Sequence, residues 1–270
     1  MSKNGQSLKE ALRSAFAAAV ILIALAVAFL VYYMVLGNPV NFQGGNHNGA
    51  PIPGNYLAMV YKGGMIVPLL ITLIIVLLTF TIERFITLRK ARGTGQINVF
   101  VTNLQNFLKN NEIDKAIASC DKQKGSIGNV MRAGLKKYKD LQTDPNLDKD
   151  QKLISLGKEF EEATALELPM MSRNLVILST IASISVLIGL IGTVLGMIRA
   201  FAALAQAGAP DALALATGIS EALINTAFGI TGSTLAIIFY NYFQTKIDTM
   251  TYKIDEAGFS LTQTFASQNK

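Results

Sequence analysis

Four long stretches of this 270-residue chain contain no Asp, Glu, Lys or Arg: residues 14–61, 63–82, 174–198 and 222–245. A helix that crosses a bilayer needs about 20 predominantly apolar residues, and each stretch can hold one. Only 16% of the residues are charged, whereas soluble domains carry about 25%. These runs predict an all-α membrane protein with four transmembrane helices. They exclude an ordinary soluble enzyme, a disordered chain and a disulfide scaffold.

The first apolar segment has two interpretations. A basic start followed by an apolar core is also typical of a cleaved signal peptide, but such a core has only about 7–15 residues. We therefore favour a retained helix, with a cytoplasmic N-terminus at 1–13 and an extra transmembrane helix at 14–36. The Asn-Pro, Gly-Gly and Asn-Gly pairs that follow are turn signals. They predict an irregular periplasmic loop at 37–63, with His47 as a surface residue rather than a metal ligand.

After the second expected transmembrane helix, at 64–84, the composition changes. Sixteen of the 24 Lys and Arg residues and 12 of the 18 Asp and Glu residues lie in 83–173. We expect a helical cytoplasmic domain at 85–173, in which a last helix begins near Asp148 and is kinked at Pro169. Apolar residues at helical spacing predict three packing faces. These are Val99, Leu104, Phe107 and Leu108; then Ile113, Ala116, Ile117 and Cys120; then Val130, Met131, Leu135 and Tyr138.

The distribution of Lys and Arg predicts the orientation, because cytoplasmic segments of membrane proteins are enriched in both. The remaining segments are transmembrane helices at 174–204 and 212–243, the second extending into the cytoplasm, a periplasmic turn at 205–211 and a cytoplasmic tail at 244–270. The net charge of +6 then reflects topology, and no nucleic-acid partner is expected. Lys136, Lys137 and Lys139 could touch anionic lipid or a cytoplasmic partner; we favour a solvated helix surface.

Two ionisable residues, Arg199 and Glu221, lie within the last two spans, and such residues are functional candidates by default. If these helices fold back on each other around residues 209 and 210, Thr193 lies level with Thr226. Glu221 then lies level with Arg199, nearer the outer face. The spacing predicts a pair of hydroxyl groups at one depth and an acid with a base at another.

Each of these two spans has one face of small and polar residues. The first face contains Ala182, Ser185, Gly189, Gly192, Thr193, Gly196, Ala200 and Ala203; the second contains Gly218, Ala222, Asn225, Thr226, Gly229, Gly232, Ser233 and Ala236. Close helix packing explains the glycines. It does not explain Glu221 and Asn225, so we favour a polar pathway, which would need an oligomer or a partner helix to enclose it.

No chemistry that requires a cofactor is indicated. The chain has one cysteine, one histidine and no Gly-x-x-x-x-Gly-Lys-Ser/Thr loop, so we expect no metal, no nucleotide and no enzymatic activity. Energy for any transport would come from a gradient.

Two membrane segments, GLIGTVLGMIRAF at 189–201 and GISEALINTAFG at 218–229, resemble the TolQ/ExbB/MotA proton-channel family, closest to ExbB and TolQ. The stretch NEIDKAIASC at 111–120 is similar to the helical loop of that family. The resemblance implies a pentameric subunit of a bacterial inner-membrane motor. The resemblance implies that the pentamer surrounds the helices of a single-span ExbD/TolR-like partner, and that an intramembrane aspartate of this partner takes up and releases the proton. Thr193, Thr226 and Glu221 would line the path, supported by Asn225, Arg199, Gly192, Gly196, Gly229 and Ser233.

The resemblance further implies that proton flow drives a TonB- or TolA-like protein for outer-membrane transport or envelope maintenance. Two features depart from the family pattern: the extra helix at 14–36, and the lack of proline between residues 174 and 209, which argues against the flagellar stator branch. The alternatives are a passive membrane scaffold in which Arg199 and Glu221 form a salt bridge, a flagellar or gliding stator subunit, and a stand-alone solute transporter.

Overall fold

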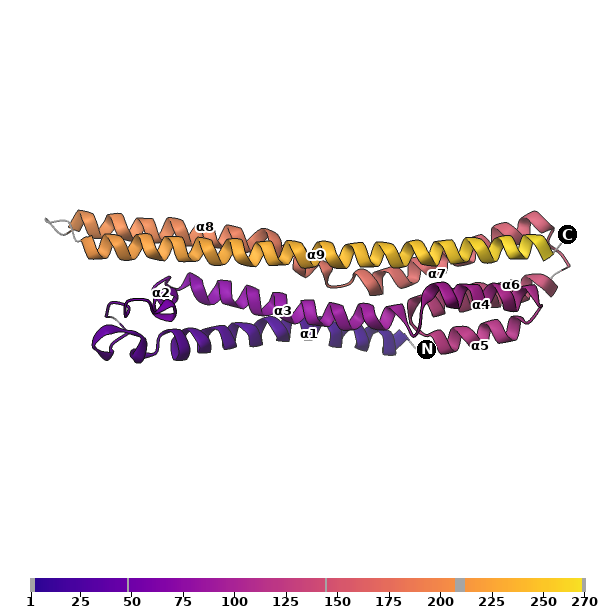
Figure 1. The fold of residues 1–270 in the computed structure, drawn as a ribbon, viewed down its shortest axis with the longest axis horizontal. Coiled ribbons are helices and arrows are strands. Elements are labelled where there is room, and N and C mark those ends of the chain that lie inside the picture. Colours follow the sequence, from indigo (N-terminus) through magenta and orange to yellow (C-terminus); the bar gives the residue numbers. More distant parts are fainter. Residues whose placement is uncertain (1–2, 48, 144, 207–211, 269–270) are drawn as a thin grey trace. The chain divides into compact units, whose positions relative to one another are not determined.

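The computed structural model describes residues 3–47, 49–143, 145–206 and 212–268, which are mostly α-helical (Figure 1). The chain forms two compact units. The first comprises Met1–Ile82 and Val176–Tyr240, and the second Glu83–Leu175 and Asn241–Lys270. Within these described ranges, four helices are long and apolar enough to span a membrane, so the prediction of an all-α membrane protein with four spans is confirmed. Residues 207–211 of the expected periplasmic turn lie outside the described residues.

The first unit begins with α1 (Lys3–Leu30), which continues into a π-helical segment, η1 (Val31–Leu36). Every fourth residue along this segment is buried: Ala24, Ala28, Tyr32 and Leu36. A spacing of four keeps side chains on one helical face. At the C-terminal end of that face, Tyr32 and Leu36 pack with Val67 of the next span. The first apolar segment is therefore a packed helix, and its retention in the mature protein stays a prediction.

The segment between the first two spans is irregular, as expected, apart from one short helix. It contains two 3-10 turns, η2 (Pro39–Asn41) and η3 (Gln43–Gly45), followed by α2 (Tyr56–Tyr61). The side chain of Asn55 caps α2 by accepting hydrogen bonds from the backbone N–H groups of Leu57 and Ala58. His47 is exposed, as predicted.

Four helices build most of the second unit: α4 (Ile97–Lys109), α5 (Ile113–Gln123), α6 (Gly125–Thr143) and α7 (Lys149–Ser172). The predicted packing faces of α5 and α6 are confirmed by the burial of Ala116, Cys120 and Leu135. The prediction for Val99 on α4 is wrong, because this side chain is 55% exposed. At 100° per residue it lies about 140° from Leu104. The buried face of α4 instead consists of Ile97, Phe100, Leu104 and Leu108.

The helix α7 starts where the sequence predicts. Asp148 accepts a hydrogen bond from the backbone N–H of Gln151, whose side chain accepts one from the backbone N–H of Asp148; this reciprocal pair is a capping box. The expected kink at Pro169 does not end the helix, which continues to Ser172. The break comes at Asn174, whose φ of 61° is left-handed.

The last helix, α9 (Ala212–Gln268), is longer than predicted. We expected a transmembrane helix at 212–243 that extends into the cytoplasm and a cytoplasmic tail at 244–270; in the structure the same helix continues through 244–268. The reason is a repeat of apolar residues spaced three or four apart, all buried in the second unit: Phe243, Ile247, Met250, Ile254, Ala257, Leu261 and Phe265. Such a spacing forms one continuous face, and Phe265 meets Tyr138 of α6 edge to face at 4.7 Å.

The second span, α3 (Ile66–Arg92), also continues beyond its charge-free run, which ends at residue 82, by nearly three turns. Charge alone does not end a helix, and α3 stops only at Gly93, whose φ is 75°. The side chain of Arg84 is buried at this end. It pairs with Glu83 and donates a hydrogen bond to the carbonyl oxygen of Met171 at 3.2 Å.

Candidate functional site

The helix α8 (Leu175–Gln206) and the first half of α9 run side by side in the first unit (Figure 1). Glycines let their backbones touch. A Cβ atom at Gly189 would lie 2.9 Å from the carbonyl oxygen of Asn225, and one at Gly196 would lie 2.9 Å from that of Gly218. Real Cβ atoms do not approach backbone so closely. The two small-residue faces predicted from the sequence therefore form a tight seam between α8 and α9.

Within this seam the two predicted hydroxyl groups meet. The side chains of Thr193 and Thr226 are hydrogen-bonded to each other through their Oγ1 atoms. The Thr193 hydroxyl also lies 3.2 Å from the carbonyl oxygen of Gly189 and 3.4 Å from that of Ala222. Both threonines are half-buried. The antiparallel register expected from the sequence is thus the observed one.

One to two turns toward the α8–α9 connection, Arg199 and Glu221 form an ion pair. The two partners differ in environment, because the Glu221 side chain is 9% exposed and that of Arg199 is 56% exposed. The carboxylate is therefore the enclosed member of the pair. The ion pair neutralises the charge of Glu221. The alternative interpretation, a passive scaffold, requires the same ion pair.

Asn225 lies between these two pairs and is fully buried. Its side-chain amide donates a hydrogen bond to the carbonyl oxygen of Gly63 at 2.9 Å. Its Oδ1 atom has no hydrogen-bond partner among the described residues. Gly192 packs directly against this side chain, since a Cβ atom there would lie 2.6 Å from Cγ of Asn225.

Polar groups continue along the seam in the other direction. The Ser233 hydroxyl donates to the carbonyl oxygen of Ala182 at 2.5 Å. Ser185 is fully buried, and its hydroxyl has no partner within the described ranges. From Glu221 to Ser233 the distance along α9 is about 18 Å. The polar side chains thus follow one face of α9 through more than half of a bilayer core of about 30 Å.

Sequence reasoning missed the backbone that covers this site. Gly63 and Gly64 precede α3, and Gly64 has a φ of 77°. A Cβ atom at Gly64 would collide with Oε1 of Glu221. Tyr32 of η1 donates a hydrogen bond to the carbonyl oxygen of Tyr61 at 2.9 Å, which links the extra N-terminal helix to the same segment. The Lys-Gly-Gly sequence directly before an apolar run is the sequence feature that could have indicated a close backbone approach here.

No group of three or more His, Cys, Asp or Glu residues that could hold a metal ion occurs in the described part of the chain. The site therefore consists of hydroxyl, amide, carboxylate and guanidinium groups between two apolar helices. Such groups can pass or bind protons.

The same helices are matched by a known family. The model of the MotA/TolQ/ExbB proton channel family matches residues 122–256, which is half of the chain. The chain belongs to the MotA/TolQ/ExbB proton channel family. As a member of this family it is a multi-pass protein of the inner membrane, and the resemblance noted in its sequence is confirmed.

Curated relatives of this family member carry the names TolQ and ExbB. TolQ of Pseudomonas aeruginosa is 32% identical over 120 residues, which are 44% of this chain and 52% of the relative. TolQ of Haemophilus influenzae is 28% identical over 200 residues, or 72% and 86% of the two chains. ExbB of Salmonella typhimurium is 36% identical over 91 residues, or 34% and 37%. The chain thus spans about half the length of the Pseudomonas relative.

Proposed function

We propose that this chain is the proton-path subunit of an inner-membrane motor that uses the proton gradient to drive work at the outer membrane. The observation that carries the proposal is the hydrogen-bonded pair of Thr193 and Thr226 within a line of polar groups between apolar helices. A proton can move along hydroxyl groups, and Glu221 can bind it at the outer end of the line. Placing polar and ionisable side chains at this depth in a membrane costs free energy, so such residues are rare and usually mark a functional site.

One chain does not enclose a pore, so the path requires further subunits. Outward-facing apolar residues cover the remaining faces of α8 and α9: Leu190, Ile191, Val194, Leu223 and Ile230 are each at least half exposed. We propose that these faces meet lipid and further copies in a homo-oligomer, a pentamer by family resemblance. An ExbD/TolR-like single-span subunit with an intramembrane aspartate then completes the path, and a TonB- or TolA-like protein receives the force.

The central test removes the hydroxyl groups but keeps the side-chain volume. In the native host at native expression level, Thr193→Val combined with Thr226→Val should abolish energised uptake or envelope integrity. The matched control is Thr180→Val with Thr231→Val. These two threonines lie on the same helices and are exposed, and each donates a hydrogen bond to a carbonyl oxygen of its own helix, that of Val176 or Ala227, at 2.7 Å. Equal activity of both double variants would refute the assigned path.

The ion pair of Arg199 and Glu221 favours a second candidate, a passive scaffold. Glu221→Gln separates the two, because glutamine keeps the volume and accepts a hydrogen bond from Arg199 but does not titrate. A motor subunit then loses activity while it assembles normally, as judged by native mass in mild detergent. A scaffold subunit keeps its activity or fails by dissociating. Five copies with one or two single-span chains are the mass expected for the motor.

We further propose that 1–13, 85–173 and 244–270 face the cytoplasm, and that 37–63 and 205–211 face the periplasm. The excess of Lys and Arg in the first group supports this orientation. In a Cys120→Ser background, a membrane-impermeant maleimide applied to intact cells should label Gln43→Cys but not Lys122→Cys. Both positions are exposed in the structure. The opposite pattern would reverse the orientation.

A further inference from the structure

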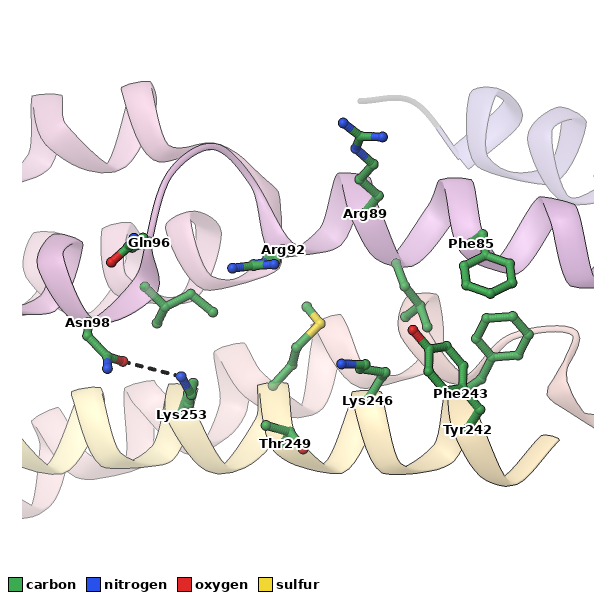
Figure 2. Close-up of a pocket in the computed structure, with 13 residues that line it drawn as sticks. Phe85, Arg89, Arg92, Gln96, Asn98, Tyr242, Phe243, Lys246, Thr249 and Lys253 are labelled. Atoms are coloured by element: carbon green, nitrogen blue, oxygen red, sulfur yellow. Dashed lines mark hydrogen bonds between the residues drawn. The ribbon is translucent and has the colours of Figure 1, made fainter. Parts of the chain in front are cut away.

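The second unit contains a pocket of about 720 Å³ between the end of α3, the start of α4 and the second half of α9 (Figure 2). Four cationic residues line it: Arg89, Arg92, Lys246 and Lys253. We call this site the basic pocket. Its volume is within the range of small-molecule sites, about 300–1,000 Å³. Figure 2 shows Arg92 and Lys246 extending into the space between the helices from opposite sides.

The positive charge of the basic pocket is not neutralised by the protein. Within the described part of the chain, no Asp or Glu lines the pocket, and none of its four cations forms an ion pair. Lys253 donates only to the neutral side chain of Asn98, at 3.3 Å. Like charges gathered without an acid repel one another, so the arrangement favours an anion from outside the chain.

A second cationic surface of this unit differs from the basic pocket. Arg132, Lys136 and Lys137 line a second pocket together with Asp140 and Glu159, and Lys139 pairs with Asp114 at 2.7 Å. Those cations have acids beside them. The distinction separates the basic pocket from an ordinary solvated helix surface.

One end of the basic pocket is aromatic. The ring of Phe85 lies 5.6 Å from that of Tyr242 and 4.9 Å from that of Phe243, measured between centroids. The ammonium group of Lys246 lies 5.6 Å from the Tyr242 ring centroid. Aromatic residues followed by cations are typical of the boundary between the bilayer core and its headgroups.

The position of the pocket along both helices agrees with that boundary. The charge-free run of the second span ends at residue 82, three residues before Phe85. The charge-free run of the last span ends at residue 245, directly before Lys246. Arg89 and Lys246 each follow the aromatic residue of their own helix, Phe85 or Tyr242, by four positions, or about 6 Å. Cations at this level face phosphate groups rather than acyl chains.

We propose that the basic pocket binds the phosphate headgroup of an anionic phospholipid, with Arg92 and Lys246 on the phosphate and the aromatic end against the glycerol and upper acyl region. The lipid would join α3 to α9 at the level where their apolar segments end. Asn98 and Gln96 add hydrogen-bonding groups at the end of the pocket away from the aromatic rings (Figure 2), where a glycerol headgroup would be held.

The test uses the full chain, purified in a neutral detergent and stripped of lipid, with native mass spectrometry as the readout. Phosphatidylglycerol should bind saturably and at least tenfold more tightly than phosphatidylcholine. Arg92→Gln with Lys246→Gln should weaken its binding about 30-fold, since each basic residue near an anionic headgroup contributes about 1 kcal/mol. The matched control, Lys136→Gln with Lys137→Gln, removes the same charge from the same unit and should change binding less than twofold.

A charge-preserving variant, Arg92→Lys with Lys246→Arg, should bind phosphatidylglycerol within a few-fold of the parent, which separates loss of charge from loss of fold. Equal weakening by both double glutamine variants would overturn the proposal. Equal binding of the two lipids would also overturn it. Displacement of phosphatidylglycerol by inorganic phosphate or ATP at matching concentration would assign the pocket to a soluble phosphate ligand instead.

Discussion

The side chain of Asn225 on α9 donates a hydrogen bond to the backbone carbonyl of Gly63, 162 positions earlier in the chain. This bond fixes the segment before α3 against the α8–α9 seam, next to Glu221. The carboxylate is therefore enclosed by three parts of the chain: its own helix, Arg199 of α8 and the backbone at Gly64. A buried hydrogen bond of this kind leaves little freedom for the acid to move unless the segment moves with it.

The contact between Gly64 and Glu221 can be tested by adding one methyl group. In Gly64→Ala the new Cβ would collide with the carboxylate and lie 3.2 Å from Nη1 of Arg199. Alanine at a left-handed φ costs about 1–2 kcal/mol, and displacement of Glu221 should in addition abolish motor activity. The control is Gly54→Ala, at a φ of 81° with open space around its Cβ. It should lose similar thermal stability and keep its activity. If the two variants are equally active, the Gly64 contact does not matter for function.

Replacement by alanine should have opposite effects at two helical glycines, one inside the α8–α9 seam and one outside it. Gly189→Ala pushes a methyl group to 3.1 Å from Cα of Gly229, and backbone atoms cannot rotate away. We expect a loss of about 1–3 kcal/mol and weakened assembly. Gly157→Ala on α7 has nothing within 4 Å and should stabilise by about 0.5–1 kcal/mol. Thermal unfolding in detergent measures both; a neutral Gly189→Ala would contradict the close approach.

The helical extension of α9 should be needed to fold the second unit. Phe265 is fully buried against Tyr138, so Phe265→Ala should destabilise this unit by about 3–5 kcal/mol. Phe259 is on the same helix and 66% exposed; Phe259→Ala should stay within about 0.5 kcal/mol of the parent. Hydrogen exchange of α4 to α7 reports the difference. Equal protection in both variants would mean that the extension does not stabilise the unit.

Cys120 should be unreactive while the second unit is folded. Burial, and then the neighbouring Asp121, raise the pKa of its thiol to about 12, and the side chain is 2% exposed. At pH 8 a disulfide reagent should therefore react orders of magnitude faster with the denatured chain than with the native one. The folded form also keeps a proton that the unfolded form releases above about pH 8.5, so stability should fall as the pH rises beyond that value. Rapid labelling of the native protein at pH 8 would disprove the burial.

Much of the membrane part follows from local rules. Charge-free runs must be helical inside a bilayer because no water is present to satisfy the backbone. The two small-residue faces follow from helical periodicity, and the short chain distance between the end of α8 and the start of α9 favours an antiparallel register, which brings Thr193 to Thr226 and Arg199 to Glu221. These pairs were predictable because the residues are close in sequence, on two consecutive helices.

Other features depend on contacts between distant segments, which periodicity does not encode. The sequence shows a polar Asn225 but not its acceptor, Gly63, and it shows Gly64 without the carboxylate that requires a glycine there. The apolar repeat from Phe243 to Phe265 was hidden by charged residues between its members, so only the packed second unit reveals that the tail is helix.

The sequence by itself determined the helical membrane class, the number of spans and the register of the last two. The tertiary structure alone decided which polar groups are enclosed and what covers them, and it brought the four cations of the basic pocket together from two distant parts of the chain. The physical reason is that helix formation and membrane insertion depend on neighbouring residues. Enclosure of a charge depends on which segments the folded chain places around it.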